Sequence, residues 1–537
     1  TLARSFFKHV GTIRAPRSTK TTVTDSGPDT SPTPDASPTP GADTSTAPAL
    51  DLAKSRRWRS AWRVHFYAGI FAIPFIVLMA LTGLVILYTQ PIEKATQPDF
   101  PTVKVTGEAR PYDELAQAVA TEYPDATVTG LRVPTKDSES VLFTVADDPD
   151  DEEAVPLDVF VNQYNGEVLG SSREGSGIVG LSNRLHGFLN NDKASVSLPT
   201  VSALWDHGAV MRPYVIGDLI LEVLGVWTLV LIATGLVLWY PRRTKATQRR
   251  KWLSMRWSKG GRPRWRDVHA MSGLGMFLVL GVTIISGLGW STYWGSNFTA
   301  LANEISPNSW TDAPPSTLGT RGDLDRLGNK IPWNTGDRPI PASYAPASDD
   351  APAPLSLDSV VGIGQSEGMK PGFSVIFPAN AVDEATGDMT YGSFTLSNSW
   401  PRKTNEGRDL FLDQFSGQTL AEQNGWGYGS VSYAMDSLVS AHMGTQMGII
   451  TRVAMTALCL FALTSAFAAS AMFIRRARRS HVAPRREHDV RLDRRMGIVA
   501  TGMAVVFPVW ALTAGAILAV DRFIIRRTRL RFAFGER

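Results

Sequence analysis

The chain has 537 residues, of which 43% are hydrophobic and 19% charged, with a formal net charge of +4. This length allows roughly three or four units of ordinary domain size, and because the basic residues gather beside apolar segments, a nucleic-acid partner is not expected. The single cysteine, Cys459, excludes an internal disulfide, and the chain has no Cys-x-x-Cys-His attachment motif.

Apolar segments decide the class of the protein. A run of about 18 or more mostly uncharged residues is long enough to cross a membrane. The sequence therefore predicts a polytopic α-helical membrane protein with about five transmembrane helices. The expected spans are 62–89, 214–240, 268–294, 449–474 and 497–521.

Residues 1–55 precede the first span and are expected to form a disordered cytoplasmic tail. They contain a tract rich in Ser, Thr, Pro, Asp and Ala at 19–50, and they lack the apolar stretch of a signal peptide. We therefore expect the first span to serve as the insertion signal.

The distribution of Lys and Arg predicts the orientation, because short cytoplasmic loops are rich in both. The segment 241–266 holds eleven Lys and Arg and no acid, and 475–496 holds nine Arg against three acids. We expect the loops 241–267 and 475–496 to be cytoplasmic. The two polar inserts, 90–213 and 295–448, then lie outside the cytoplasm.

The basic tail 522–537 does not fit this orientation, since five spans place it on the outer side. Two alternatives remain open. Pro508 breaks the last span into a re-entrant hairpin, or packing overrides the charge rule.

Each insert is expected to be an α+β unit. The first contains an amphipathic helix pattern at 111–123 and a strand pattern at 140–145. Alternating apolar and polar residues at 157–166 and again at 408–417 predict β-hairpins that turn at Asn-Gly and Ser-Gly. The second half of the chain therefore repeats the first.

The duplication includes a matched pair of histidines at the start of two spans. His65 and His269 are each followed by glycines four and eighteen residues later: Gly69, Gly83, Gly273 and Gly287. Two imidazoles at one depth, each with a small residue one turn further on, favour axial ligation of a non-covalently bound haem. The alternative is that each histidine is an interfacial polar residue at a helix start.

A second matched pair follows the hairpins, before the returning spans. His186 and His442 lie 20 and 25 residues beyond the hairpin glycines, on the outer side. Ligation of a second haem is the favoured interpretation, and exposed loop histidines are the alternative. His207 has no counterpart in the second half, but it lies between His186 and the second span, so it is the other candidate for the outer site.

Several residues near these pairs are possible supporting groups. Arg63, Arg242, Arg243 and Arg266 can pair with haem propionates, or they follow only the rule that basic residues flank the cytoplasmic side. Trp227 is more often a packing residue than a bridge between two cofactors.

Asp218 and Glu222 stand four residues apart on one face of the second span. Carboxylates inside a span suggest proton or ferric-ion contact, yet acids in the first turn of a helix are also favoured by the helix dipole. Both interpretations remain open.

Four segments and the two inserts resemble a known family. The segments 62–69, 227–242, 266–269 and 442–448 resemble the PepSY-associated transmembrane proteins, and the inserts are similar to PepSY domains, so the resemblance covers about 55–525. Members include bacterial inner-membrane reductases of ferric siderophores, which carry two b-type haems on four histidines. The resemblance implies two haems b on His65, His269, His186 and His442.

The function expected from these patterns is electron transfer across the membrane to a ferric siderophore outside. The chain has no Gly-x-Gly-x-x-Gly motif after a strand, so the donor is expected to be a separate reductase, a quinol or a soluble carrier. The alternative is a non-enzymatic regulatory or assembly subunit, in which PepSY inserts act beside another membrane complex.

Overall fold

The computed structural model describes residues 47–96, 100–146, 155–240, 261–398, 403–477 and 494–527, apart from 174, 192, 202–209, 311–315, 317, 328–332, 347–351, 383–386 and 525–526. The chain divides into two compact units, Thr1–Leu52 and Ala53–Arg537. All contacts discussed below lie within the second unit.

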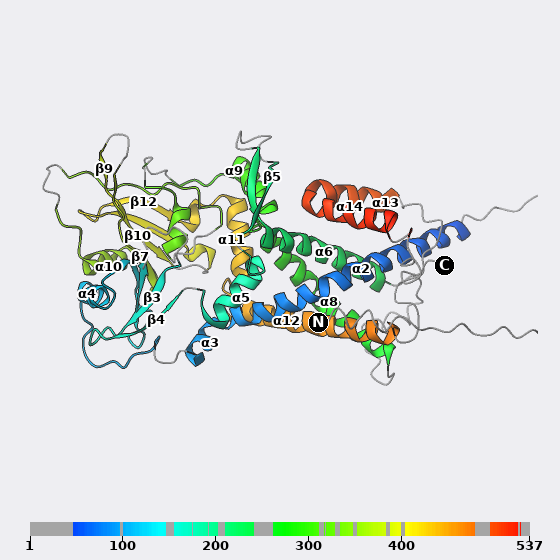
Figure 1. Ribbon diagram of the computed structural model, residues 1–537, viewed down its shortest axis with the longest axis horizontal. Helices are drawn as coiled ribbons and strands as arrows, with labels where there is room; N and C mark the ends of the chain where they lie inside the picture. Colours follow the sequence, from blue (N-terminus) through cyan, green and yellow to red (C-terminus); the bar gives the residue numbers. More distant parts are fainter. Residues whose placement is uncertain are drawn as a thin grey trace, which may run out of the picture. The chain divides into compact units, whose positions relative to one another are not determined.

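Four helices are long and apolar enough to cross a membrane, among the residues described. They form one bundle (Figure 1) and are α2 (Ala47–Leu87), α6 (Ile216–Trp239), α8 (Arg262–Leu288) and α12 (Ile449–Ala477). Even α6, with 24 residues, rises about 36 Å, more than a hydrocarbon thickness of about 30 Å. We call the end of the bundle where the inserts begin the outer end and the opposite end the inner end.

The expected fifth span, 497–521, differs from the prediction because it is not one long helix. Helix α13 (Arg494–Val506) ends before Phe507, and α14 (Pro508–Phe523) begins at the proline. Proline has no N–H to continue the helix and disfavours helical geometry in the preceding residue. The two helices have 13 and 16 residues, so they rise only about 20 and 24 Å.

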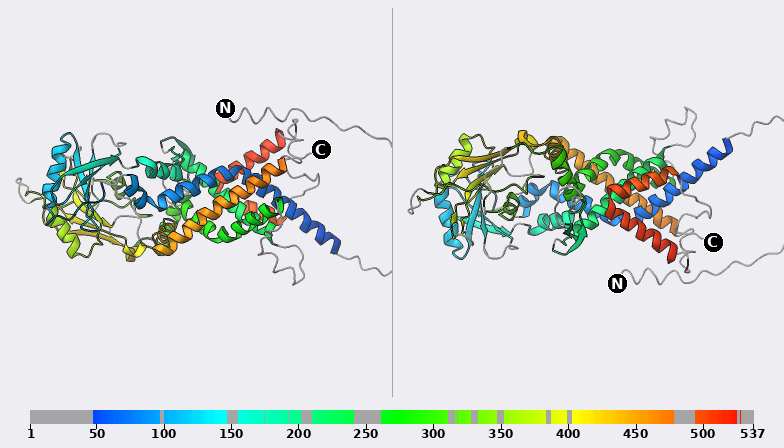
Figure 2. Two further views of the ribbon diagram at one scale, coloured as in Figure 1. Left: turned by 90° about the horizontal axis from the view of Figure 1, so that it is seen from below. Right: turned by 90° about the horizontal axis from the view of Figure 1, so that it is seen from above.

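The break turns the chain back. The Phe507 ring lies 5.8 Å from that of Trp294, just beyond the outer end of α8. The Trp227 indole N–H, halfway along α6, donates to Thr513 Oγ1 at 3.3 Å. Helix α14 therefore returns toward the inner end beside α6, and Figure 2 shows α13 and α14 meeting at an angle. The helix break at Pro508 follows the re-entrant alternative, under which the basic tail would lie on the same side as the other basic segments.

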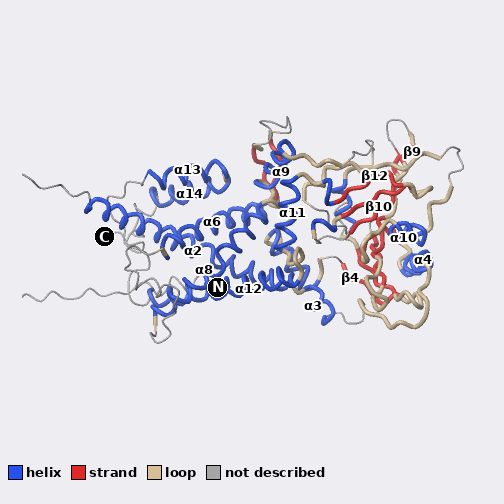
Figure 3. Tube along the Cα trace, turned by 180° about the vertical axis from the view of Figure 1, so that it is seen from behind, coloured by secondary structure: helices blue, strands red, loops and turns tan. Residues whose placement is uncertain are grey.

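The strands of both inserts form one sheet, which Figure 3 shows apart from the long helices. Its order is β12-β11-β10-β7-β1-β2-β3-β4, with every pair antiparallel. The first insert supplies β1 (Thr127–Arg132), β2 (Val141–Ala146), β3 (Leu157–Val161) and β4 (Val168–Arg173), and the second supplies β7 (Phe373–Ile376), β10 (Ser393–Asn398), β11 (Arg408–Asp413) and β12 (Thr419–Asn424).

The duplication predicted from the sequence is visible element by element. Helix α4 (Tyr112–Glu122) precedes β1 as α10 (Leu357–Ser366) precedes β7. Helices α5 (Gly177–Phe188) and α11 (Ser430–His442) follow the two hairpins. Both hairpin glycines, Gly166 and Gly417, have positive φ, 76° and 73°, a backbone conformation that glycine adopts without strain.

The two inserts are joined at the centre of the sheet, where β1 pairs with β7. Leu131 lies opposite Val375, and a single hydrophobic core contains residues of both inserts. The first residues of α4 and α10 bond each other reciprocally. The Tyr112 N–H donates to Asp358 at 3.1 Å, and the Leu357 N–H donates to Asp113 at 3.1 Å. The inserts are therefore two repeats of one packed unit.

The remaining elements are shorter. They are α3 (Thr89–Thr96), α9 (Trp294–Ile305), β5 (Ser195–Pro199), β6 (Met211–Val215), β8 (Ala381–Val382), β9 (Met389–Thr390) and the 3-10 turns η2 (Arg321–Leu327), η3 (Thr404–Glu406) and η4 (Gly425–Gly427).

The re-entrant path of α14 predicts the side on which the chain ends. In a Cys459→Ser background, Arg522→Cys should resist a membrane-impermeant maleimide added to right-side-out vesicles and react after permeabilisation, because α14 returns to the inner end. Trp426→Cys, at a position that is 90% exposed on an insert, is the control that should react at once. Equal labelling of both cysteines in sealed vesicles would mean that α13 and α14 together cross the membrane once and leave residue 522 on the outer side.

Candidate functional site: two histidine pairs

One pair of histidines lies toward the inner end of the bundle. His65 on α2 and His269 on α8 have ring centroids 6.0 Å apart and ring planes at 70°. The His65 Nδ1 lies 3.0 Å from Thr234 Oγ1 on α6, and the His269 Nδ1 lies 2.8 Å from Ser465 Oγ on α12. All four long helices therefore contribute to this inner pair.

The outer pair repeats this arrangement. His186, in the last turn of α5, and His442, the last residue of α11, have ring centroids 6.1 Å apart and planes at 72°. The His186 Nδ1 lies 2.9 Å from Thr82 Oγ1 on α2, and the His442 Nδ1 lies 3.2 Å from Ser286 Oγ on α8. The two short helices thus bring their imidazoles to the outer parts of α2 and α8.

The spacing of eighteen residues between each span histidine and its second glycine corresponds to the distance between the inner pair and the outer pair. A Cβ atom on Gly83 would lie 3.4 Å from His186 Cε1, and one on Gly287 would lie 3.9 Å from His442 Cε1. Eighteen residues along a helix correspond to about 27 Å. The glycine eighteen residues after each span histidine is therefore the point where the outer ring rests on the same helix.

The separation within each pair suits a shared metal ion. Two imidazoles that bind one ion from opposite sides, with bonds of about 2 Å, have ring centres roughly 6 Å apart. Since each Nδ1 contacts a hydroxyl group, Nε2 is the nitrogen left for a metal. The residues described contain no group of three or more His, Cys, Asp and Glu that could hold a metal ion.

The inner pair also has bare helix surface beside it. A Cβ atom on Gly273 would meet no atom within 4 Å, and one on Gly69 would meet only Leu231 Cδ2, at 3.8 Å. These are the small residues one turn beyond each histidine. Side chains larger than hydrogen are missing where a flat ring would lie against the helices, so the residues present fit a haem.

Burial favours the neutral form of the two outer imidazoles. Burial lowers the pKa of both His186 and His442 to about 4, and at His442 the nearby His186 lowers it further. Both rings therefore lack a proton on one nitrogen at neutral pH. That is the form in which histidine binds metals.

The other candidates from the sequence have different surroundings. Trp227 packs against Trp510, with ring centroids 5.3 Å apart, between α6 and α14, which favours the packing interpretation. Arg266, whose side chain is 64% exposed, pairs with Asp267 at 3.3 Å. Arg63 is half-buried, two residues before His65. Arg242, Arg243 and His207 lie outside the described residues.

Asp218 and Glu222 both bond the turn between α8 and α9. Glu222 is 3% exposed and accepts from Ser291 Oγ and the Trp294 N–H, both at 2.9 Å. Asp218 accepts from the backbone of Thr292. These bonds support the structural interpretation of the two carboxylates.

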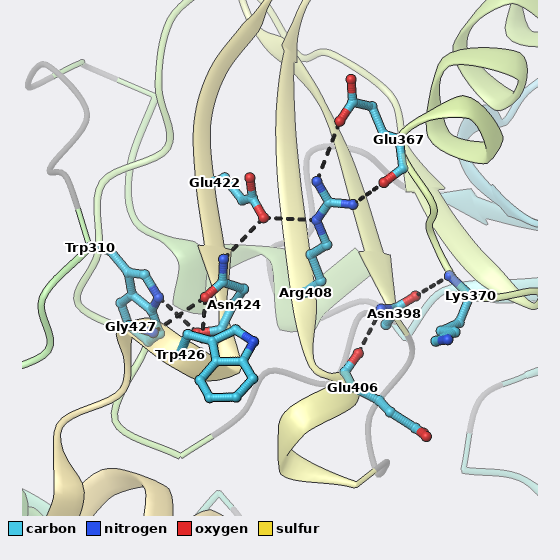
Figure 4. Close-up of polar contacts among 10 residues, drawn as sticks. All are labelled: Trp310, Glu367, Lys370, Asn398, Glu406, Arg408, Glu422, Asn424, Trp426 and Gly427. Carbon is cyan, nitrogen blue, oxygen red and sulfur yellow. Dashed lines mark hydrogen bonds and ion pairs between the residues drawn. The ribbon is translucent and has the colours of Figure 1, made fainter.

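The second insert also contains a polar cluster around Arg408 (Figure 4). Arg408 donates to Glu422 Oε1 at 2.8 Å and pairs with Glu367, and the Asn424 side chain accepts from the Trp426 N–H at 3.0 Å. The cavity beside the cluster has room for about one water molecule. This cluster therefore suits the joining of β11, β12 and α10 better than the binding of a chelate.

The hydroxyl residues beside the imidazoles were missed from the sequence. They are Thr82, Thr234, Ser286 and Ser465. A signal was present for three of them, because a hydroxyl residue precedes Gly-Leu at 82–84, 234–236 and 286–288. This pattern indicates an imidazole partner only once the helix that packs beside it is known.

A family model, the PepSY-associated TM region, matches residues 62–476. The chain belongs to this family. The match begins within α2 and ends within α12, so it includes α6, α8, both inserts and all four histidines, and it confirms the resemblance seen in the sequence. A search of curated proteins gives no match.

The structural interpretation of Glu222 can be tested by two substitutions. Glu222→Ala leaves buried donors without an acceptor, at a cost of about 1–3 kcal/mol, so the thermal unfolding temperature in detergent should fall clearly. Glu222→Gln provides an amide oxygen that can still accept these bonds, so its unfolding temperature should fall less. A proton-transfer role would show the opposite pattern, with Glu222→Gln fully stable yet inactive in electron transfer.

Proposed function

We propose that this protein transfers electrons across a membrane through two b-type haems, one on His65 and His269 and one on His186 and His442, and reduces a ferric siderophore on the outer side. The observation that carries the proposal is the pair of ring separations, 6.0 and 6.1 Å, at two levels of one bundle. Bound between two imidazoles, a haem supplies reversible one-electron transfer and has no open position for oxygen.

The chain's own residues provide the rest of the function. The helices fix two imidazoles on opposite sides of each site, and the apolar side chains between the levels exclude water. Ala80, Cys459 and Ala462 form one buried cluster there, with Met276 and Leu84 packed against it. A dry, rigid surrounding keeps the histidines from exchanging their partners for water.

The proposed reaction moves one electron per ferric ion. A donor on the inner side, which is a quinol, a soluble carrier or a separate reductase, is oxidised, and the ferric chelate is reduced to its ferrous form. Hard oxygen ligands hold ferrous iron less tightly than ferric iron, so reduction favours release. The basic segments 241–266 and 475–496 support a cytoplasmic inner side, and we infer the bacterial inner membrane as the location.

The first prediction from this proposal concerns cofactor content. The purified protein should carry about two haems b with low-spin bis-imidazole bands, because it offers two pairs of histidines. His65→Ala or His269→Ala should remove one haem and leave the other, and His186→Ala or His442→Ala should remove the second. A pyridine haemochrome assay measures the content per chain.

His207→Ala is the matched control, since His207 is the competing outer candidate. It should keep both haems. Loss of the outer haem in His207→Ala and its retention in His186→Ala would reassign the outer ligand. No haem in wild-type protein from haem-replete cells would contradict the proposal. Co-purification of such haem-free protein with another membrane complex at fixed stoichiometry would support the subunit alternative.

The second prediction concerns the acceptor. Chemically reduced protein should be reoxidised by a ferric siderophore without another subunit, and ferrous iron trapped by a chelator should appear at the same rate in stopped-flow mixing. His442→Ala should slow this reaction at least tenfold while the inner site stays reducible. Reduced wild-type protein that is stable toward a panel of ferric chelates would exclude this acceptor class.

A further inference from the structure

All four histidines contact a hydroxyl group in the same manner. Each Nδ1 faces the side chain of a Thr or Ser on a neighbouring helix, at 2.8 to 3.2 Å. Each hydroxyl residue belongs to the same half of the chain as its histidine. Each half therefore orients its own two imidazoles with its own hydroxyl residues.

Three of the hydroxyl groups already use their hydrogen. Thr82 Oγ1 donates to the Leu78 carbonyl at 2.8 Å, and Thr234 Oγ1 donates to the Val230 carbonyl at 2.6 Å. Ser286 Oγ donates to the Thr283 carbonyl at 2.7 Å. A hydroxyl has only one hydrogen, so toward the imidazole these oxygens accept, and the ring must donate from Nδ1–H.

The fourth contact leads to the same ring form by a different route. The His269 Nδ1 lies 3.1 Å from the Ser465 carbonyl as well as 2.8 Å from its hydroxyl oxygen. A carbonyl oxygen can only accept, so Nδ1 of this ring also carries the hydrogen. A neutral ring with its hydrogen on Nδ1 has an unprotonated Nε2, so each of the four contacts leaves Nε2 as the nitrogen that can bind a metal.

A small residue follows each hydroxyl residue and makes room for the ring. A Cβ atom on Gly235 would lie 3.3 Å from His65 Cε1, and one on Gly83 would lie 3.4 Å from His186 Cε1. Gly287 and Ala466 hold the corresponding places beside the other two hydroxyls. The hydroxyl residue and the small residue after it thus form one seat for each imidazole.

We infer that Thr82, Thr234, Ser286 and Ser465 are positioning residues, which hold each imidazole with Nε2 free and set the reduction potential of the site that it serves. The inference rests on the proposed function, because a potential exists only where a haem is bound. A hydrogen-bond acceptor at Nδ1–H makes the ring a stronger electron donor and stabilises ferric iron. Removal of that acceptor should therefore raise the potential.

The experiment compares Thr82→Val, which keeps the shape of the side chain and removes its hydroxyl, with Thr82→Ser, which keeps the hydroxyl. Redox titration should show the midpoint potential of the outer site of Thr82→Val raised by ~59 mV, which for one electron is a tenfold lower ferric-to-ferrous ratio at a given potential, with the inner site unchanged. Thr82→Ser should restore the wild-type value. Thr234→Val should shift only the inner site.

Ser465→Ala provides an internal comparison, because the Ser465 carbonyl remains as an acceptor for His269. Its shift should be smaller than that of Thr82→Val on the outer site, because Thr82 Oγ1 is the contact given for His186 Nδ1 among the described residues, with no backbone carbonyl beside it. Equal shifts would overturn the assignment of the hydrogen to Nδ1. Each variant is first checked for haem content and thermal unfolding, so that a loss of fold is seen separately.

A second readout needs no haem. In haem-free protein labelled with ¹⁵N-histidine, the nitrogen shifts should show Nδ1–H rings in the wild type and a mixture of ring forms at His186 in Thr82→Val. This result supports the inference even if Thr82→Val binds no haem. An unchanged potential and unchanged ring form in Thr82→Val would overturn it. Wild-type protein that binds no haem even in haem-replete cells, yet shows Nδ1–H rings, would overturn only the proposed function.

Discussion

The association of the two halves of the chain is the constraint on which both histidine pairs depend. Each pair takes one imidazole from each half, His65 with His269 and His186 with His442. Neither half contains a complete pair. The central pairing of β1 with β7 and the exchanged bonds of Asp113 and Asp358 join the inserts in the same two-fold manner. The symmetry of the duplication therefore places equivalent side chains opposite each other.

Within each half, a second requirement shapes the sites. A buried polar group without a hydrogen-bond partner costs free energy, and an imidazole between apolar helices has few partners available. Thr and Ser supply them at little cost in a helix, because their hydroxyl hydrogen bonds the carbonyl of their own preceding turn. The result is a ring with a defined orientation. The need to satisfy a buried donor thus fixes the orientation of each imidazole.

The last helices show how one proline divides an expected span into two short helices. Pro508 ends α13 and begins α14, and both pieces are too short to span hydrocarbon. Aromatic packing of Phe507 near Trp294, and the bond from Trp227 to Thr513, hold the returning helix against α6. Hydropathy alone predicts a single span here, because the apolar residues of both helices fall in one continuous window. Pro508 and the basic tail are the two features of the sequence that conflict with a single span.

The sequence by itself determined the membrane class, the duplication, the long spans and the two hairpins, because hydrophobic length, periodicity and turn glycines are local properties. It also marked His65, His269, His186 and His442 as two equivalent pairs through their repeated positions. The tertiary structure alone decided what depends on neighbours distant in the chain. Those features are the continuous sheet of both inserts, the turn held by Glu222, and the hydroxyl partners of the imidazoles. Ser465 lies 196 residues from His269, and no local pattern states which helices pack together.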